Sequence, residues 1–334
     1  MIVVLDSNIW IAEFGLRSSL GALARFYIHR KNARLGLPEV IRLEVEHNLR
    51  NQIQRFTAAI EDAHRQLLML FGTLKQVVVP NASAIDTKVG ELFRDVGIDI
   101  IDVPFSLKSA RSSYLKTIDK TPPSDKTQEF KDGVLWADCI ELLEGDDVCL
   151  VTKDKAFFEG REYSNGLSKA LVAETTSARH QFSLMPSLAE LVKELRVDVS
   201  IDEDKLVQAY LAKNADLLTD MLNRNGFVLG DRHSLAKTLY VTEQPSVLYV
   251  EFSMEFIANE IAGDGRSDGI VTAIGDGTYD AHSHIFSNLR NRGETLRFQQ
   301  SDGSEVEKKN YYAFMEGLVI GHRDVSYTVR RELP

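Results

Sequence analysis

Two kinds of apolar pattern alternate over the first 197 residues. Short uninterrupted apolar runs are typical of strands buried on both faces. Residues 2–5 form such a run, and shorter or less regular apolar segments predict further strands over residues 35–37, 98–103, 147–152 and 182–185. Longer segments, in which apolar residues recur every three or four positions, predict helices with one buried face. These cover residues 18–32, 39–74, 84–96, 106–119, 130–143, 167–177 and 187–195. Strands that alternate with helices indicate a mostly parallel sheet in a three-layer α/β/α domain, which we place over residues 1–197.

The pattern changes near residue 198. An acidic stretch leads into a predicted helix over residues 203–223, and strand-like segments follow. The glycine pairs Gly263/Gly265 and Gly275/Gly277 predict turns between strands. We therefore expect residues 198–334 to form a smaller α+β domain, with strands over residues 238–242, 247–256, 269–281 and 326–331.

The composition narrows the class of protein. The length of 334 residues allows two domains. No apolar run is long and uncharged enough to predict a membrane-spanning helix. The chain opens with Asp6 close behind its first apolar run, unlike a secretory signal, so we expect a cytoplasmic protein. Cys139 and Cys149 form no metal-type spacing and are expected to be reduced thiols.

The charge balance argues against a protein that coats nucleic acid. The net charge is −10, and the region after residue 200 is the more acidic part. Residues 17–55 and 106–131 reverse this sign, with eight basic against three acidic and six basic against three acidic side chains. Such segments would suit a short phosphate track. The alternative is that they are solvated helix faces.

Four acidic residues are candidates for a catalytic metal site. Asp6 and Asp154 follow the first and fourth strands, where functional groups of parallel sheets collect. Glu44 lies in the long helix, and Asp132 opens the helix after a proline break. Carboxylates held together repel unless cations lie between them, and oxygen ligands favour Mg²⁺ or Mn²⁺. Such ions can promote phosphodiester hydrolysis by water. Alternatively, the two strand-end aspartates are N-caps, and the other two acids are exposed helix residues.

The sequence around these acids resembles a PIN domain. The opening strand with Asp-Ser-Asn-Ile, the helical glutamate, Glu-Phe-Lys-Asp-Gly-Val-Leu-Trp and Val-Thr-Lys-Asp-Lys-Ala-Phe are similar to the bacterial PIN-like branch with a long second helix, over about residues 1–195. The resemblance implies a three-layer α/β/α fold and divalent-metal ribonuclease activity. It also implies that Asn8 and Thr152 orient the acids, and that Gly133 replaces a larger residue of many relatives. The metal-binding carboxylates that it implies are Asp6, Glu44, Asp132 and Asp154.

Further polar residues are weaker candidates. Lys126, Lys153 and Lys155 flank the acids and could contact phosphates, or be plain surface lysines. His282 and His284 would share one face of a strand, but no third ligand has a clear spacing. Additional acidic ligands, for which surface placement is favoured, are Asp125, Glu129 and Asp138.

We therefore expect a metal-dependent endoribonuclease that uses Mg²⁺ or Mn²⁺. A role as a toxin or defence effector is suggested only by the family resemblance, because such roles occur among family members. The alternatives are a DNA-directed or structure-selective nuclease and a PIN scaffold that acts as a regulatory binding module. The C-terminal region would select the RNA substrate, control activation, or hold a regulatory partner or a second copy in a homo-oligomer.

Overall fold

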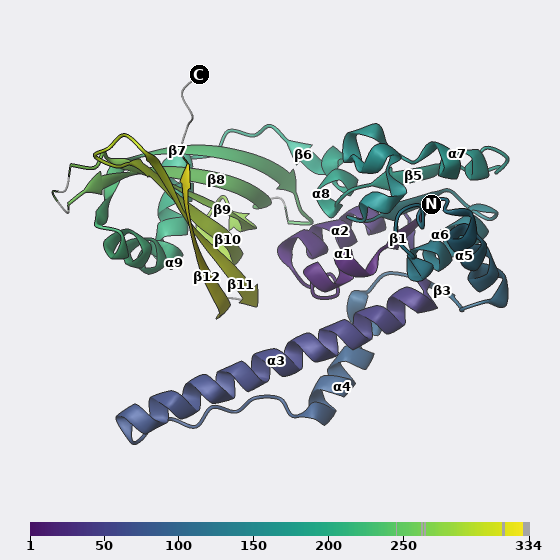
Figure 1. Cartoon of the computed structure of the whole chain (residues 1–334), viewed down its shortest axis with the longest axis horizontal. Helices are drawn as coiled ribbons and strands as arrows, with labels where there is room; N and C mark the ends of the chain where they lie inside the picture. Colours follow the sequence, from purple (N-terminus) through teal and green to yellow (C-terminus); the bar gives the residue numbers. More distant parts are fainter. Residues whose placement is uncertain (245, 262, 264, 316–317, 330–334) are drawn as a thin grey trace. The chain divides into compact units, whose positions relative to one another are not determined.

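The chain folds into two compact units, Met1–Glu194 and Leu195–Pro334, each with its own sheet (Figure 1). The structure is a computed structural model that describes residues 1–244, 246–261, 263, 265–315 and 318–329. The division falls just before strand β6 (Arg196–Val197), which pairs with β7 of the second sheet. Residues 195–197, which the sequence pattern assigned to the first domain, therefore belong to the second unit.

The N-terminal unit is built on five parallel strands, as the apolar runs predict. The central pair is formed by β1 (Ile2–Leu5) and β4 (Val148–Val151), whose residues are all buried. Apolar side chains on both faces are what a sheet covered on both sides requires. In order across the sheet, the strands are β3 (Ile100–Val103), β2 (Arg34–Pro38), β1, β4 and β5 (Phe182–Met185).

Helices flank this sheet and confirm the three-layer α/β/α fold. Two of them begin where serine hydroxyls accept backbone N–H groups: Ser18 accepts from Gly21, and Ser106 accepts from Ser109. The first helix was not predicted, because six residues are too few to show periodicity. The helices are α1 (Ser7–Ala12), α2 (Ser19–Arg30), α3 (Glu39–Phe71), α4 (Ala82–Gly90), α5 (Leu107–Asp119), α6 (Phe130–Leu143), α7 (Lys169–Thr175) and α8 (Leu188–Leu191). Short 3₁₀ turns cover residues 94–96, 155–157, 159–161, 163–165 and 193–195.

Helix α3 is much longer than the sheet it covers. Only Ile41, Val45 and Leu49, all in its first half, are buried, and the rest extends away from the sheet with α4 beside it (Figure 1). The helix ends before Gly72, which has a φ of 76°. A left-handed glycine is a common helix stop, which explains why the helix does not reach Leu74 as predicted.

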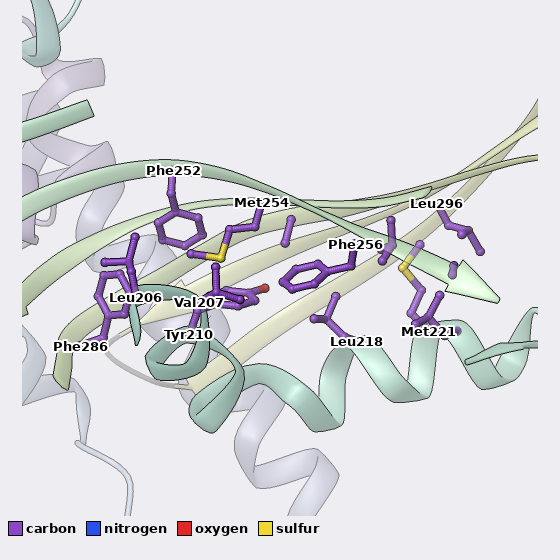
Figure 2. Packing of buried hydrophobic residues seen from close by; sticks show 14 of the residues in the cluster. Leu206, Val207, Tyr210, Leu218, Met221, Phe252, Met254, Phe256, Phe286 and Leu296 are labelled. Carbon is purple, nitrogen blue, oxygen red and sulfur yellow. The ribbon is translucent and has the colours of Figure 1, made fainter. Parts of the chain in front are cut away.

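The C-terminal unit packs one helix against an antiparallel sheet. Helix α9 (Glu203–Arg224) contributes Tyr210, whose ring lies 5.3 Å from that of Phe252 and 6.4 Å from that of Phe256 (Figure 2). The sheet order is β12-β11-β10-β9-β8-β7-β6. Its long strands are β7 (Phe227–Val241), β8 (Val247–Glu260), β9 (Gly269–Asp280), β10 (Ile285–Gln299), β11 (Glu305–Met315) and β12 (Leu318–Val329).

Several strand predictions for this unit were wrong. The predicted strand over 238–242 is only the end of β7, and β10 and β11 were missed. Gly275 lies within β9 and not in a turn. Glycine is needed at this position because a Cβ would meet the ring of Phe252 and the carbonyl of Arg290 at 2.6 Å. Residues 330–331 of the last predicted strand lie outside the described residues.

The histidine pair also lies elsewhere than expected. His282 and His284 lie in the turn between β9 and β10, and not on one face of a strand. His284 has a φ of 57°, and its Nδ1 is 2.9 Å from the hydroxyl oxygen of Tyr279. The turn predicted at Gly263 and Gly265 is confirmed: both glycines lie between β8 and β9, and both have positive φ.

None of the helices in the described part of the chain combines the length and apolar composition needed to cross a membrane.

Candidate functional site

The candidate site lies where the strand order of the N-terminal sheet reverses. Strands β1 and β4 are parallel neighbours, with Leu5 opposite Val151. Their carboxyl ends therefore lie side by side, at the place where doubly wound sheets bind ligands. Asp6 follows β1 directly, and Asp154 follows β4 after two residues.

Asp6 is held by three neighbours. Its carboxylate is 4% exposed and accepts hydrogen bonds from the Ser7 backbone N–H at 2.6 Å, Asn8 Nδ2 at 2.6 Å and Thr152 Oγ1 at 2.5 Å. Burial raises the pKa of Asp6. The bonds from Thr152 and Ser7 lower it, and the charges of Asp154 and Glu44 raise it further. The structure thus brings Asn8 and Thr152 against Asp6, and their orienting role stays a prediction.

Asp132 and Asp154 approach each other from different elements. Asp132 lies in the first turn of α6, and its carboxyl is close enough to that of Asp154 to share a hydrogen bond when one of the two is protonated. Burial raises the pKa of Asp132 well above its usual range, and the charges of Asp154 and Asp6 add to that rise. Asp154 accepts the Ala156 N–H at 2.7 Å. The three aspartates therefore form one interacting group.

Both strand-end aspartates are also N-caps, as the alternative interpretation proposed. Asp6 caps α1, and Asp154 caps the 3₁₀ turn over residues 155–157. The capping bonds use Oδ1 of each side chain. Since a carboxylate has two oxygens, a cap does not prevent a second interaction.

Glu44 reaches the group through a lysine that sequence reasoning did not single out. Lys131, in the first turn of α6, donates a hydrogen bond to Glu44 Oε1. Burial lowers the pKa of Lys131, but the bond to Glu44 and the charges of Glu44, Asp132 and Asp6 outweigh this and raise it. The only signal in the sequence was its place beside Asp132, which cannot tell which way a side chain at a helix start points.

The three lysines named from the sequence are exposed. Lys153 donates its backbone N–H to Asn8 Oδ1 at 3.4 Å, so its main chain borders the site. The ammonium of Lys155 lies 5.2 Å from the centre of the Tyr163 ring. Lys126 lies in the loop before α6. Phosphate contacts by these side chains stay a prediction.

The additional acids have separate structural roles. Asp125 pairs with Arg161 Nη2 at 2.7 Å, and Glu129 accepts from the Thr127 hydroxyl at 2.6 Å. Asp138 is buried and not on the surface as favoured, because its Oδ1 accepts the Ser109 hydroxyl at 2.6 Å. Its Oδ2 has no partner within the described residues, and burial raises its pKa to about 6.

The donor set fits a hard divalent cation by chemistry. Asp6, Asp132 and Asp154 offer only carboxylate oxygens, which Mg²⁺ and Mn²⁺ prefer, and their mutual repulsion favours a cation between them. Within the described ranges, however, no three acidic, histidine or cysteine side chains form a ready-made coordination sphere. The carboxylates would therefore have to close around an ion.

The fold and the site together define a class of protein: a parallel α/β/α domain with acidic side chains at the carboxyl ends of β1 and β4. The family comparison is more specific: the PIN domain family matches residues 3–157. This segment is a PIN domain, in a family whose members are generally nucleases, so the resemblance is confirmed. The C-terminal unit is not covered by the match, and no curated protein and no solved structure matches the chain.

Proposed function

We propose that this protein is a divalent-metal-dependent nuclease that hydrolyses phosphodiester bonds in RNA. The observation that carries the proposal is the mutual interaction of Asp6, Asp132 and Asp154, which come from three separate elements of a PIN domain. The charge of Asp154 raises the pKa of both Asp6 and Asp132, and a fold has no need to gather carboxylates that repel one another in this way. Such groups are more common at functional sites than elsewhere.

The side chains of the chain would divide the work. Asp6, Asp132, Asp154 and Glu44 would hold Mg²⁺ or Mn²⁺, which supplies activation of water and neutralisation of the phosphate when bound. The Thr152 hydroxyl donates to one oxygen of Asp6, and this bond would keep the carboxylate in one orientation. No side-chain nucleophile is required.

Lys131 would act at the phosphate. Its ammonium forms an ion pair with Glu44, and the charges of Asp132 and Asp6 also raise its pKa. Once Glu44 bound an ion, the ammonium would be free to contact a phosphate oxygen. An ammonium on a flexible stem suits this role.

The preference for RNA rests on the family resemblance, and so does a toxin or defence role. The cytoplasmic location also stays a prediction. For the C-terminal unit, we propose that it selects the substrate or holds a regulatory partner or a second copy of the chain.

The test is cleavage of one end-labelled strand, prepared as RNA and as DNA, by the full chain with Mn²⁺ or Mg²⁺. We expect RNA cleavage that EDTA abolishes and that Asp154→Asn reduces at least a hundredfold. Asp119→Asn, a change at an exposed acid at the end of α5, is the matched control and should cut normally. Cleavage of DNA alone would contradict the RNA assignment. Full biological effect from Asp154→Asn would favour a binding module.

A further inference from the structure

An open groove of about 610 Å³ adjoins the acidic group. Its floor and walls come from the first turns of α3, the segment after β3 and the start of α6. Glu44 and Lys131 line it and also belong to the candidate site. The groove and the site are therefore continuous.

The groove is largely apolar although it is open to solvent. Val40, Leu43 and Phe105 line it, and Leu43 and Phe105 are 56% and 47% exposed. The Phe105 backbone N–H donates to Glu39 Oε2 at 2.8 Å, which ties the segment after β3 to the start of α3. Exposed apolar side chains gathered in a concave surface are typical of ligand sites.

Two polar side chains lie in the same groove. His47 and Asn48 follow Glu44 on α3, and His47 Nε2 is 2.9 Å from Asn51 Nδ2. The Asn48 carboxamide makes no hydrogen bond to another described residue, so both its donor and its acceptor are available. A carboxamide and an aromatic ring that line one groove offer what a nucleobase requires: a surface for stacking and a partner for its polar edge.

We propose that this groove binds one unpaired nucleobase of the substrate, with the ring of Phe105 as its stacking surface and Asn48 at its polar edge. The inference rests on the proposed nuclease function and adds that the substrate is single-stranded at this position. A phosphate beside Lys131 would place the neighbouring nucleotide at the groove. A base within a duplex is stacked and paired on both sides and could not enter.

The charge of the groove agrees with this occupant. Among the described residues that line the groove, Lys131 carries the positive charge, and it interacts with Asp132 and Asp6 of the acidic group. The remaining lining is uncharged except for Glu44, which pairs with Lys131. A nucleotide has a charged phosphate at one end and an uncharged flat base at the other, which matches this arrangement.

The experiment measures binding, not cleavage, so that the inference and the nuclease proposal can fail separately. Fluorescence anisotropy measures the Kd of the full chain, in the presence of Ca²⁺, for a short labelled RNA. The same measurement is made on copies of this RNA that carry one abasic nucleotide at each position in turn. We expect Phe105→Ala to raise Kd for the intact RNA about tenfold, which corresponds to about 1.4 kcal/mol and is within the range for loss of one stacked base. Phe105→Trp should keep tight binding.

The abasic series gives the decisive comparison. In the wild type, one abasic position should raise Kd about tenfold, and in Phe105→Ala the same position should have no further effect, because ring and base act as a pair. Phe71→Ala is the control: it removes another exposed phenylalanine, at the far end of α3 and outside the groove.

The inference is overturned if Phe105→Ala binds RNA like the wild type, or if no RNA binds. It is also overturned if the loss of binding free energy caused by Phe105→Ala adds in full to the loss at every abasic position. A blunt duplex that binds as tightly as the single strand would overturn it as well. A chain that shows the expected pattern and does not cut would contradict the nuclease proposal alone.

Discussion

Lys131 of α6 donates to the carboxylate of Glu44 of α3, and this ion pair ties two helices together at the edge of the acidic group. The ammonium also lies close enough to Asp132 and Asp6 for their charges to raise its pKa. It therefore supplies positive charge near Glu44, Asp132 and Asp6, and it would compete for Glu44 with the metal ion that we propose.

Replacement of Lys131 by Met should make the metal-free protein less stable. The side chains of Lys131 and Glu44 are 57% and 22% exposed, so the loss should be about 1 kcal/mol or less. With Mn²⁺ the loss should shrink, because Glu44 would then have a cation in place of the ammonium. Urea unfolding of the variant and the wild type, with and without Mn²⁺, measures both effects. An equal loss in the two conditions would show that Glu44 does not take part in metal binding.

The stabilisation by Mn²⁺ should grow with pH. Asp6 and Asp132 have raised pKa values, so protons compete with an ion for their oxygens. A folded-state pKa above the unfolded value means that stability without metal is highest in acid and is lost as pH rises through the folded pKa. Mn²⁺ should reverse that loss, with a larger rise in Tm at pH about 8 than at pH about 6. A rise that is constant with pH would contradict proton competition at these carboxylates.

Asp138 should limit stability at neutral pH without contributing to the site. Its pKa is raised to about 6 by burial, so its destabilising effect appears as pH rises from about 4 through about 6. Asp138→Asn keeps an oxygen for the Ser109 hydroxyl and removes the charge. We expect a gain of about 1–3 kcal/mol at pH about 8 and almost none at pH about 4. Chemical unfolding at the two pH values measures it, and a loss at pH about 8 would show that the charge has a partner.

Much of the N-terminal unit could be predicted from the sequence. Buried runs such as Ile2–Leu5 have one interpretation, and their order with the helices determines a parallel sheet. Asp6 and Asp154 could be placed because Asp6 directly follows β1 and Asp154 lies three residues after the end of β4. Lys131 and the burial of Asp138 could not be predicted, since both depend on how α6 is rotated against its neighbours.

The C-terminal strands were harder to predict, because strands such as β7 and β10 carry many polar residues. In β10, buried Phe286, Leu296 and Phe298 are separated by segments rich in arginine and asparagine, which resemble loops. Gly275 and Gly277 looked like turn residues but make room for neighbouring side chains within the sheet. Local composition cannot distinguish these two uses of glycine.

Gly133→Ala should destabilise the N-terminal unit, which explains the glycine that the family resemblance left uninterpreted. A Cβ at this position would meet Ser113 Oγ at 2.3 Å and Cβ at 2.8 Å, so α5 and α6 would have to separate. Despite the better helix propensity of alanine, we expect a loss of about 1–2 kcal/mol. In a Ser113→Gly background the same change should cost less, and urea unfolding of the four proteins tests this. Equal costs in both backgrounds would mean that Ser113 is not the obstacle.

Direct Mn²⁺ binding by the full chain, measured by calorimetry in the wild type, Asp6→Asn and Asp132→Asn, tests most directly whether the acids form one metal site. Asp119→Asn, at an exposed acid, serves as the matched control. We predict that Asp6→Asn and Asp132→Asn each weaken Mn²⁺ binding at least tenfold and that the control binds like the wild type. If Asp6→Asn, folded as judged by its melting curve, bound Mn²⁺ as tightly as the wild type, the metal-dependent site proposed here would be contradicted.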